Sequence, residues 1–465
     1  VDHDATGIAL SSDDDITVKN KIAKQMKVDV DSFTNLIKYD GTTYLSSSSS
    51  LDSTSIKSKD IWVKVNGLDV NFTNAASKVK VSDKASVTKI SGSLASLTIS
   101  DNSSVGSIAL DDDCDPSISI TDAKVGDIDF GDTSSDTAKN ELDVDSTDAT
   151  VGNVTDATDI TVKSGKTGNL DADNITVNAD DDEDTTTVGN LTGVDIELNS
   201  EDSKLSVGTV KSDDSDGTIT LEGANLSITA IDFDHYNTTL KTDDFQGKIP
   251  APLNASADGA NITTSNADDK LEITGDADID SIDIDDDSKV TFDGNLNVTD
   301  VSGDGTLVIG AGKMYIDGSA SDTILKLSDA TITKGTTVFT SLNDTVDDDD
   351  FDCYGFTLAK TEGSKTDTFK IDSVEFKGIS VNKTSSDIAK GYSETFTAYA
   401  YPGGTTMPDG YTIEWSLNDA DDSIFELTTN DNGTATVKVI GYDTDFASND
   451  QATLTATMVD ADGDE

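Results

Sequence analysis

The sequence lacks several residue types on which enzymes commonly depend. Its 465 residues include no arginine, two histidines, two tryptophans and five prolines, and only 6% are aromatic. A nucleophilic triad needs a histidine, and neither His3 nor His235 stands near a nucleophile motif. Polysaccharide-cleaving β-helices typically use basic residues to stabilise charge and aromatic rings to stack sugars. A polysaccharide-acting enzyme is therefore the least favoured of the functions considered, and we expect no catalytic activity.

Long apolar runs and cysteine frameworks are also missing. No run approaches the roughly eighteen apolar residues of a transmembrane helix, so we expect no membrane span. The chain starts at Val1 without a signal peptide, which fits the mature form of a secreted, cell-surface protein. Cys114 and Cys353 are either one long-range disulfide or two free thiols.

What is abundant is negative charge of one chemical kind. The formal net charge is −58, and only 12 of the 90 acidic residues are Glu, so Asp dominates. Such a charge disfavours nucleic acids and anionic membranes as partners and favours cations. Asp fits tight turns because its short side chain bonds nearby backbone N–H groups, and it is also a ligand for hard cations. We therefore expect divalent cations, Ca²⁺ first among them, to offset the charge.

One sequence pattern repeats between Leu94 and Ile231. An apolar–polar–apolar triplet, such as Leu97-Thr98-Ile99, is followed by a polar insert and then by a glycine turn flanked by apolar residues. The glycines recur about every twenty residues, which is typical of a solenoid whose units bury their apolar side only against neighbouring units. They are Gly106, Gly126, Gly152, Gly168, Gly189 and Gly208. The sequence thus predicts an all-β protein built on a parallel, β-helix-like solenoid.

The repeats divide the chain into five parts. Residues 1–77 are interpreted as a cap or assembly segment, and residues 78–231 as solenoid rungs. Residues 232–265 break the pattern as an insertion or joint, residues 266–371 resume the rungs, and residues 372–465 form a different domain.

The interruption at 232–265 concentrates residues that are scarce elsewhere. It holds Phe233, His235, Tyr236 and Phe245, followed by the Pro250-Ala251-Pro252 run. Aromatic residues are enriched at protein interfaces, so the segment is a candidate contact between copies. The alternative is a loop that packs locally on the solenoid.

Acidic clusters supply the candidate metal ligands. The outline Asp2-x-Asp4-x-Thr6-Gly7, with Asp13 at the twelfth position, resembles a calcium loop, although Thr6 and Asp13 depart from the usual ligands. The other reading of these clusters is an acidic, solvated surface. The remaining candidates are Asp111, Asp112, Asp113, Asp283, Asp285, Asp287, Asp347 and Asp349.

Glycosylation is a third chemical possibility. Among the Asn-x-Ser/Thr sequons, we select Asn71, Asn237, Asn254 and Asn343 as acceptors. The sequons at Asn153 and Asn190 occupy the turn of the repeat, where Asn serves backbone geometry.

Residues 372–465 contain short alternating strands separated by turn signals, which is typical of a β-sandwich with Trp415 filling its core. This part resembles the bacterial group 2 immunoglobulin-like domains. The resemblance rests on Ile379–Thr384, Ile413–Ser416, Gly433–Val437 and Leu454–Thr457, and it departs from the family at Val439–Asp443. It implies an immunoglobulin-like spacer or presentation module of surface proteins. The whole chain resembles surface-layer and fibrous surface proteins in general character.

Together these features predict an extracellular structural protein that assembles with itself into a surface layer or filament, stabilised by cations. The alternative is an adhesin stalk or carbohydrate-binding module that contacts cell-wall polysaccharide.

Overall fold

A computed structural model describes most residues of the chain. These are residues 36–39, 42–45, 49–51, 60–63, 68–73, 78–82, 84–112, 114–132, 139–179, 185–201, 203–212, 217–233, 238–252, 260–310, 313–327, 333–383, 386–403, 405–419, 424–430, 433–441 and 452–460. Every regular element in these ranges is a β-strand, so the all-β prediction is confirmed. The chain divides into two compact units, Val1–Ala260 and Asn261–Glu465, and each is considered by itself.

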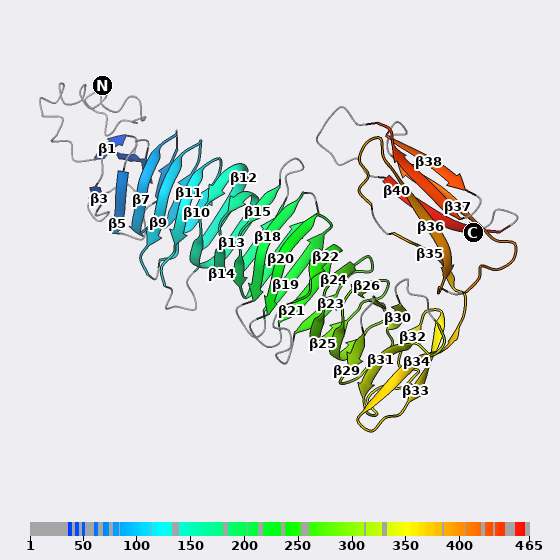
Figure 1. Cartoon of the computed structure of the whole chain (residues 1–465). Helices are drawn as coiled ribbons and strands as arrows, with labels where there is room; N and C mark the ends of the chain where they lie inside the picture. The colour runs from blue at the N-terminus through cyan, green and yellow to red at the C-terminus, as the bar shows by residue number, and fades with distance from the viewer. Residues whose placement is uncertain are drawn as a thin grey trace, which may run out of the picture. The chain divides into compact units, whose positions relative to one another are not determined.

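Unit 1 is a stack of parallel strands (Figure 1). Strands two steps apart in the chain pair with each other, because each turn contributes one strand to each of two faces. Its described strands are β1 (Leu36–Tyr39), β2 (Thr42–Leu45), β3 (Ser49–Leu51), β4 (Asp60–Val63), β5 (Leu68–Thr73), β6 (Lys78–Val81), β7 (Ser86–Ser93), β8 (Ser96–Ile99), β9 (Ser104–Leu110), β10 (Ser117–Ile120), β11 (Lys124–Asp129), β12 (Glu141–Val151), β13 (Val154–Thr167), β14 (Leu170–Asn178), β15 (Thr186–Val188), β16 (Leu191–Gly193), β17 (Asp195–Ser200), β18 (Leu205–Ser212), β19 (Thr218–Gly223), β20 (Leu226–Phe233), β21 (Thr239–Asp243) and β22 (Gln246–Pro250).

The apolar residues of the sequence repeat lie in register inside this stack. Leu97 pairs with Ile118, Ile118 with Leu142, and Leu142 with Ile160, and all four are essentially inaccessible to solvent. Period-two alternation is what a strand with one buried face requires. The β-solenoid predicted from the repeat is therefore confirmed. Parallel pairing also extends N-terminal to residue 78, because β2 and β4 pair in parallel.

Glycine is required in the repeat because the rungs approach closely. A Cβ atom at Gly126 would lie 1.9 Å from the carbonyl oxygen of Gly106, and one at Gly189 would lie 2.6 Å from that of Gly168. None of the six repeat glycines has φ in the left-handed region, so the requirement is for space.

Apart from glycine, the residues with a left-handed backbone are mainly aspartate. Nine described residues other than glycine have positive φ, and eight of these are Asp or Asn, with Asp101, Asp122 and Asp287 as examples. Asp and Asn tolerate this conformation because their short side chains bond locally. This accounts for part of the excess of Asp over Glu.

The segment 232–265 is partly a solenoid rung. Strand β21 pairs in parallel with β19, and Phe233 and Phe245 are buried in the interior. These two aromatic rings pack locally, as the alternative interpretation expected, and offer no surface to a second copy. His235 and Tyr236 lie outside the described residues.

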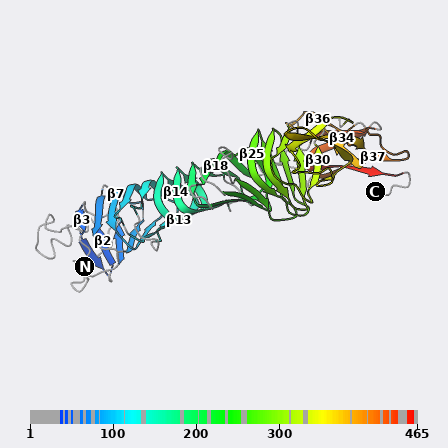
Figure 2. The same cartoon turned by 90° about the horizontal axis from the view of Figure 1, so that it is seen from below.

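Unit 2 begins with a second set of parallel strands, seen from another direction in Figure 2. Strands β23, β25, β27, β29 and β31 pair successively, as do β24, β26, β28, β30 and β32. The described strands are β23 (Asn261–Thr264), β24 (Lys270–Thr274), β25 (Ala277–Asp283), β26 (Lys289–Phe292), β27 (Leu296–Ser302), β28 (Thr306–Ile309), β29 (Met314–Ile316), β30 (Ile324–Leu327), β31 (Thr337–Leu342), β32 (Asp352–Cys353), β33 (Phe356–Thr361), β34 (Thr366–Val374), β35 (Gly378–Val381), β36 (Ser393–Tyr401), β37 (Thr412–Asp419), β38 (Phe425–Asn430), β39 (Thr434–Val439) and β40 (Ala452–Val459).

The parallel pattern of unit 2 ends in an antiparallel cap. Strand β34 pairs antiparallel with both β31 and β33, so this part of 266–371 departs from the expected rungs. Phe339 stacks on Phe369 with ring centroids 4.3 Å apart, and Phe351 meets Phe339 edge-on at 5.4 Å. The cap therefore covers an end of the stack that would otherwise be an unpaired sheet edge.

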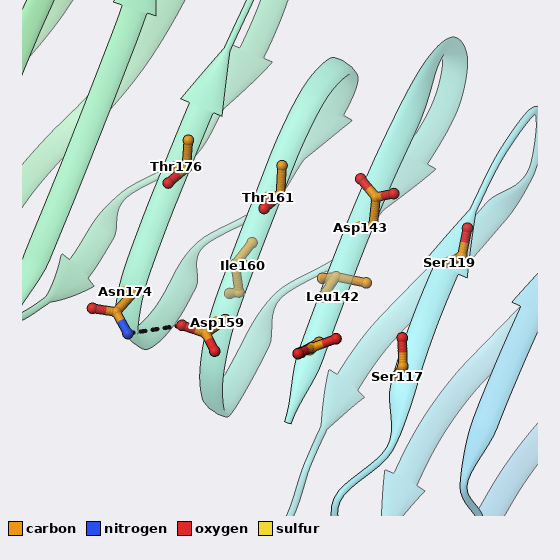
Figure 3. Close-up of a pocket in the computed structure, with 10 residues that line it drawn as sticks. Ser117, Ser119, Leu142, Asp143, Asp159, Ile160, Thr161, Asn174 and Thr176 are labelled. Atoms are coloured by element: carbon orange, nitrogen blue, oxygen red, sulfur yellow. Dashed lines mark hydrogen bonds between the residues drawn. The ribbon is translucent and has the colours of Figure 1, made fainter. Parts of the chain in front are cut away.

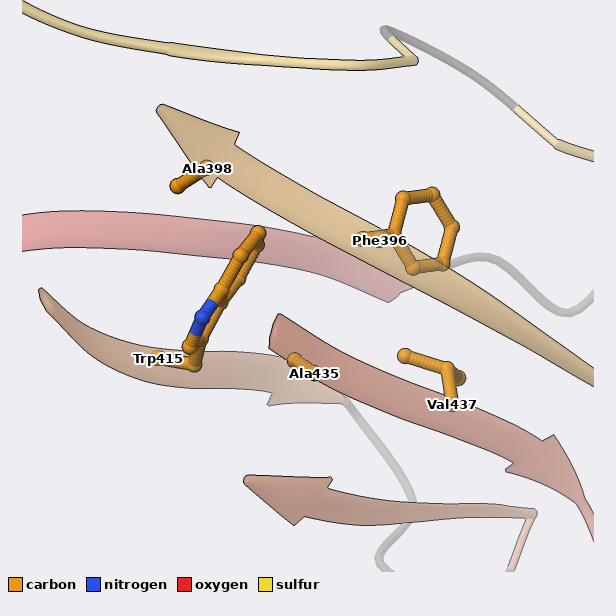
Figure 4. Packing of buried hydrophobic residues seen from close by; sticks show 5 residues of the cluster. All are labelled: Phe396, Ala398, Trp415, Ala435 and Val437. Carbon is orange, nitrogen blue, oxygen red and sulfur yellow. The ribbon is translucent and has the colours of Figure 1, made fainter. Parts of the chain in front are cut away.

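The last strands form two further sheets. One has the order β35-β36-β39-β38, and the other consists of β37 and β40, all antiparallel. Residues from both sheets share a core around Trp415, which packs with Phe396, Ala398, Ala435 and Val437 (Figure 4). Trp415 thus takes the core position expected from the sequence.

Candidate functional site

A hollow of about 440 Å³ lies on the outward face of the unit 1 stack (Figure 3). It spans four neighbouring strands, β10, β12, β13 and β14, and its polar side chains come from outward positions between the buried apolar residues. The lining residues are Ser117, Ser119, Glu141, Leu142, Asp143, Asp159, Ile160, Thr161, Asn174 and Thr176.

The polar lining is arranged in columns because the strands pair in register. One column runs Ser117, Glu141, Asp159 and Asn174, each paired with the next. The parallel column two residues further along runs Ser119, Asp143, Thr161 and Thr176. Neighbouring strands lie about 4.8 Å apart, so the side chains of a column are close neighbours. The hollow therefore presents carboxylate, hydroxyl and amide groups side by side.

Two of the carboxylates in the hollow differ in their partners. Asp159 Oδ1 accepts a hydrogen bond of 2.7 Å from Asn174 Nδ2. Asp143 Oδ1 is shielded from solvent and accepts no hydrogen bond from any described residue, and Lys163 Nζ lies 4.0 Å away. The same ammonium group lies closer, at 3.4 Å, to Asp145 Oδ2. Asp143 and Asp159 therefore have different hydrogen-bond environments in the hollow.

Carboxylates stack in other columns of unit 1. Glu222 pairs with Asp243 on the next rung and with Asn199 on the previous rung. Burial raises the pKa of the Glu222 carboxyl above its usual range, and the charges of Glu201 and Asp243 raise that pKa further. Neighbouring rungs therefore repel each other electrostatically at this column.

Another column is built from turn residues and joins five rungs. Asp127 Oδ1 accepts the backbone N–H of Asn153 at 2.8 Å, and Asn153 Oδ1 accepts that of Asn169 at 3.0 Å. Asn169 Oδ1 accepts the N–H of Asn190 at 2.9 Å, and Asn190 Oδ1 accepts the N–H of Thr209 at 2.9 Å. We call these five residues the amide ladder. Each of the first four side chains accepts a hydrogen bond from a backbone N–H of the following rung.

Unit 2 contains a shorter version of the same arrangement. Asp276 Oδ1 accepts the backbone N–H of Asn295 at 2.7 Å, and Asn295 Oδ1 accepts the N–H of Lys313 at 3.1 Å. The hydrogen bonds from the backbone and side chain of Asn295 lower the pKa of Asp276. The sequence signal for both ladders is a glycine followed by Asp or Asn, as in Gly126-Asp127 and Gly294-Asn295. We assigned Asn153 and Asn190 a backbone role, but the sequence did not show that their side chains act on the next rung.

Two groups of predicted metal ligands lie at or beyond the edge of the described chain. Asp2, Asp4, Asp13 and Asp113 are outside the described residues. Asp111 Oδ2 accepts a hydrogen bond from Ser93 Oγ at 2.9 Å, and Asp112 Oδ1 accepts the backbone N–H of Asp132 at 3.2 Å.

The metal candidates of unit 2 are also engaged in local contacts or turns. Asp283 Oδ1 accepts a hydrogen bond from Ser302 Oγ at 3.0 Å, and the N–H of Asp285 donates to Thr264 Oγ1 at 2.8 Å. Asp287 has a φ of 60°. The exposed Asp347 forms an ion pair of 2.9 Å with Lys360, and Asp349 is exposed in a turn. Within the described ranges, no three His, Cys, Asp or Glu side chains are grouped to hold a metal ion.

The selected sequons have different environments. Asn71 lies within β5, and Asn343 lies in an exposed turn that follows β31. Asn237 and Asn254 fall outside the described residues.

Both cysteines are free thiols, Cys114 buried and Cys353 partly buried. Burial, with a smaller contribution from the charge of Asp352, raises the pKa of Cys353 to about 12. Cys353 is therefore a thiol and not a thiolate at physiological pH.

The fold places the chain in the broad class of β-solenoid proteins with an additional antiparallel β region. No protein-family model matches it, and neither the curated proteins nor the solved structures provide a match. No helix within the described ranges is long and apolar enough to cross a membrane.

Proposed function

We propose that the chain is an extracellular structural protein that assembles with itself into a surface layer or filament. The observation that carries the proposal is the in-register stack, in which backbone pairing and the amide ladder connect successive rungs. Such a stack repeats the same backbone geometry at every rung, with polar side chains outward. A repeated surface suits contacts between many copies better than it suits chemistry at one point.

Divalent cations have a role in this proposal. Two unit charges at the rung spacing of about 4.8 Å repel by about 1 kcal/mol in water and by several times more near a protein surface. The column through Glu222 and Asp243 contains such a pair. Calcium accepts six to eight oxygen ligands in flexible geometry, so it is able to join carboxylates from neighbouring rungs or neighbouring copies.

Electron microscopy and thermal unfolding test the proposal. The full chain is imaged with Ca²⁺ and after chelation, with monovalent salt added to match ionic strength. We expect ordered arrays or fibres with Ca²⁺, and a lower Tm with dispersed particles after chelation. Dispersed particles in both conditions would contradict self-assembly. An unchanged Tm and unchanged arrays after chelation at low salt would contradict the role of calcium alone.

The hollow on β10–β14 favours a second candidate function, an adhesin stalk or a carbohydrate-binding surface module. Sugars present many hydroxyl groups, and the hollow is lined by carboxylate, hydroxyl and amide side chains. The test is binding of soluble cell-wall polysaccharides to the protein and to Asp143→Asn. Glu197→Gln is the matched control, because Glu197 lies in the same column but outside the hollow. Equal binding by both variants would contradict the proposal that the hollow binds carbohydrate.

We propose further that β35–β40 form an immunoglobulin-like sandwich. The order β35-β36-β39-β38 corresponds to the A-B-E-D sheet of that fold, and the pair β37–β40 corresponds to strands C and F. The shared core around Trp415 supports the same assignment. Such modules act as spacers or presentation domains in the surface proteins that the sequence resembles.

A further inference from the structure

Two lysines stand on neighbouring rungs of unit 2. Lys270 begins β24 and Lys289 begins β26, and the two residues pair in register at outward positions of their strands. Lys270 is exposed, and Lys289 is half-buried. Neighbouring strands lie about 4.8 Å apart, so two positive charges are held side by side. We call Lys270 and Lys289 the lysine pair.

The charge of the lysine pair is not neutralised within the described part of the chain. Neither ammonium group forms a hydrogen bond or an ion pair with a described residue. Burial lowers the pKa of Lys289, and the charge of Lys270 lowers it further. The negative charge of Glu272 opposes this shift without cancelling it. An anionic group bound at the lysine pair would therefore relieve both the desolvation and the repulsion.

Unit 1 carries two carboxylates with the same spacing. Glu141 of β12 pairs in register with Asp159 of β13, and both residues line the hollow of Figure 3. We call them the carboxylate pair. Neither forms an ion pair with a described residue, whereas Asp143 in the same hollow has Lys163 Nζ 4.0 Å away. Burial raises the pKa of the neighbouring Asp173, and the charge of Asp159 raises it further, so negative charge accumulates at this place.

The two pairs are complementary in charge and in spacing. Each pair spans one rung, so the same strand spacing of about 4.8 Å sets both separations. When two stacks lie side by side with their stacking directions aligned, two lysines are therefore able to meet two carboxylates at once. Lysine carries its charge on a flexible four-carbon stem, which lets an ammonium group reach into a hollow. The hydroxyl and amide groups of the hollow supply further acceptors around the carboxylates.

We propose that the lysine pair of one copy binds the carboxylate pair of a second copy of this chain. This inference rests on the proposed self-assembly and names its contact. The column through Glu222 and Asp243 fits the lysine pair less well, because Lys241 Nζ already lies 3.9 Å from Asp243 Oδ2. The two surfaces differ, so the contact is heterologous and every copy offers both of them. A heterologous contact that does not close into a ring generates an open filament or layer.

The net charge of the chain makes the position of the lysines decisive for any contact between copies. Each copy has a formal charge of −58 and only 32 basic residues, so two copies repel each other over most of their surfaces. A stable contact must bring lysines of one copy against carboxylates of the other. Complementary charges across an interface also fix its register and disfavour other alignments. The lysine pair and the carboxylate pair meet these requirements with two matched charges each.

Charge reversal in separate copies tests the contact. One full-length variant carries Lys270→Glu and Lys289→Glu, and the other carries Glu141→Lys and Asp159→Lys. Each variant alone brings like charges together, so we expect the concentration needed for arrays to rise about tenfold or more. In an equal mixture each variant supplies the charge that the other has lost, and arrays should return near the concentration at which the unmodified protein forms them. Electron microscopy and sedimentation velocity at fixed Ca²⁺ and low salt measure both effects.

A matched control separates the contact from the effect of net charge. Lys124 and Lys313 are exposed and lie outside both pairs, and replacing both with Glu changes the net charge as much as the reversed lysine pair does. This control should assemble like the unmodified protein. Circular dichroism and Tm establish that every variant is folded. An equal loss of arrays in the control and in the Lys270→Glu, Lys289→Glu variant would overturn the role of the lysine pair.

The outcomes distinguish this inference from the proposed function. Arrays from either reversed variant alone, at the concentration that suffices for the unmodified protein, would overturn the contact and leave self-assembly intact. A mixture of folded variants that fails to recover arrays would also overturn the contact. Small complexes of the unmodified protein that each variant loses and the mixture regains, without arrays in any sample, would overturn the layer or filament and leave the contact intact.

Discussion

Replacement of Gly189 by alanine probes the close spacing of the rungs. The added Cβ would lie 2.6 Å from the carbonyl carbon and oxygen of Gly168 and 2.8 Å from Asn169 Oδ1. Ordinary carbon contacts begin near 3.5 Å, so the two rungs must separate by nearly 1 Å. Gly189 also donates a backbone hydrogen bond of 3.0 Å to Gly168 O, and the neighbouring Asn190 donates to Asn169 Oδ1 at 2.9 Å.

The expected loss of stability combines these two effects. Overpacking costs about 1–3 kcal/mol, and weakening a hydrogen bond costs about 0.5–1.5 kcal/mol. We therefore expect Gly189→Ala to lower the free energy of unfolding by about 2–4 kcal/mol. Since a solenoid opens locally between neighbouring repeats, faster amide hydrogen exchange should appear first in β14–β18.

Urea unfolding followed by circular dichroism and hydrogen exchange measure the effect. Thr187→Ser, at an exposed position of β15, is the surface control and should change stability by less than about 0.5 kcal/mol. Gly335→Ala is the conformational control, because Gly335 has a φ of 90° and no atom within 4 Å of the added Cβ. A Gly189→Ala protein within about 0.5 kcal/mol of the unmodified protein would refute the spacing argument.

Four further results are expected from the electrostatics and hydrogen bonding. The pKa of Glu222 is raised, so its contribution to stability falls as pH rises through its titration; Glu222→Gln should gain about 0.5 kcal/mol near neutral pH and nothing in acid, by urea unfolding. The pKa of Asp367 is lowered, chiefly by the N–H of Asp344, so its stabilisation is present above the pKa of the unfolded chain and is lost as pH falls; Asp367→Asn should flatten the acid limb of a Tm–pH profile. With a pKa of about 12, only about one Cys353 in ten thousand is a thiolate at pH 8, so iodoacetamide should label it slowly until the protein is unfolded, as mass spectrometry would show. Asn169→Ala should destabilise the amide ladder by about 0.5–1.5 kcal/mol, whereas Asn169→Asp, which keeps the acceptor, should cost less. Rapid labelling of folded Cys353, or equal effects of the two Asn169 variants, would contradict these assignments.

The interior of the solenoid was predictable because the alternation of apolar and polar residues along each strand identifies the buried side chains. Leu97 and Ile99 both point inward, and the same spacing recurs in every triplet, so period-two alternation identified the strands without knowledge of their neighbours. The outward columns were not predictable in this way. Glu141 and Asp159 are adjacent in space because their strands pair in register. The inserts between rungs differ in length, so this pairing is not visible in the sequence. The hollow on β10–β14 is a product of that register.

The aromatic residues of 232–265 left two interpretations open for a related reason. Their local concentration made the segment a candidate interface, with local packing on the solenoid as the alternative. Phe233 and Phe245 are both buried in the interior, in agreement with local packing. The distinction depends on which face of a short strand is inward, and a one-residue change in register reverses that face.

Part of the acidity of the chain follows from the backbone conformation, and this affects what is expected of bound cations. Asp101 and Asp122 occupy left-handed turns, and Asp127 and Asp276 accept backbone hydrogen bonds from the next rung. Glu is too long for these local contacts, so the backbone itself selects Asp at many positions. Each such choice adds a negative charge, whether or not a metal ion is bound nearby. The proposed role of divalent cations is therefore to offset charge that accumulates along the rungs, and its signature should be a graded rise of Tm with cation concentration.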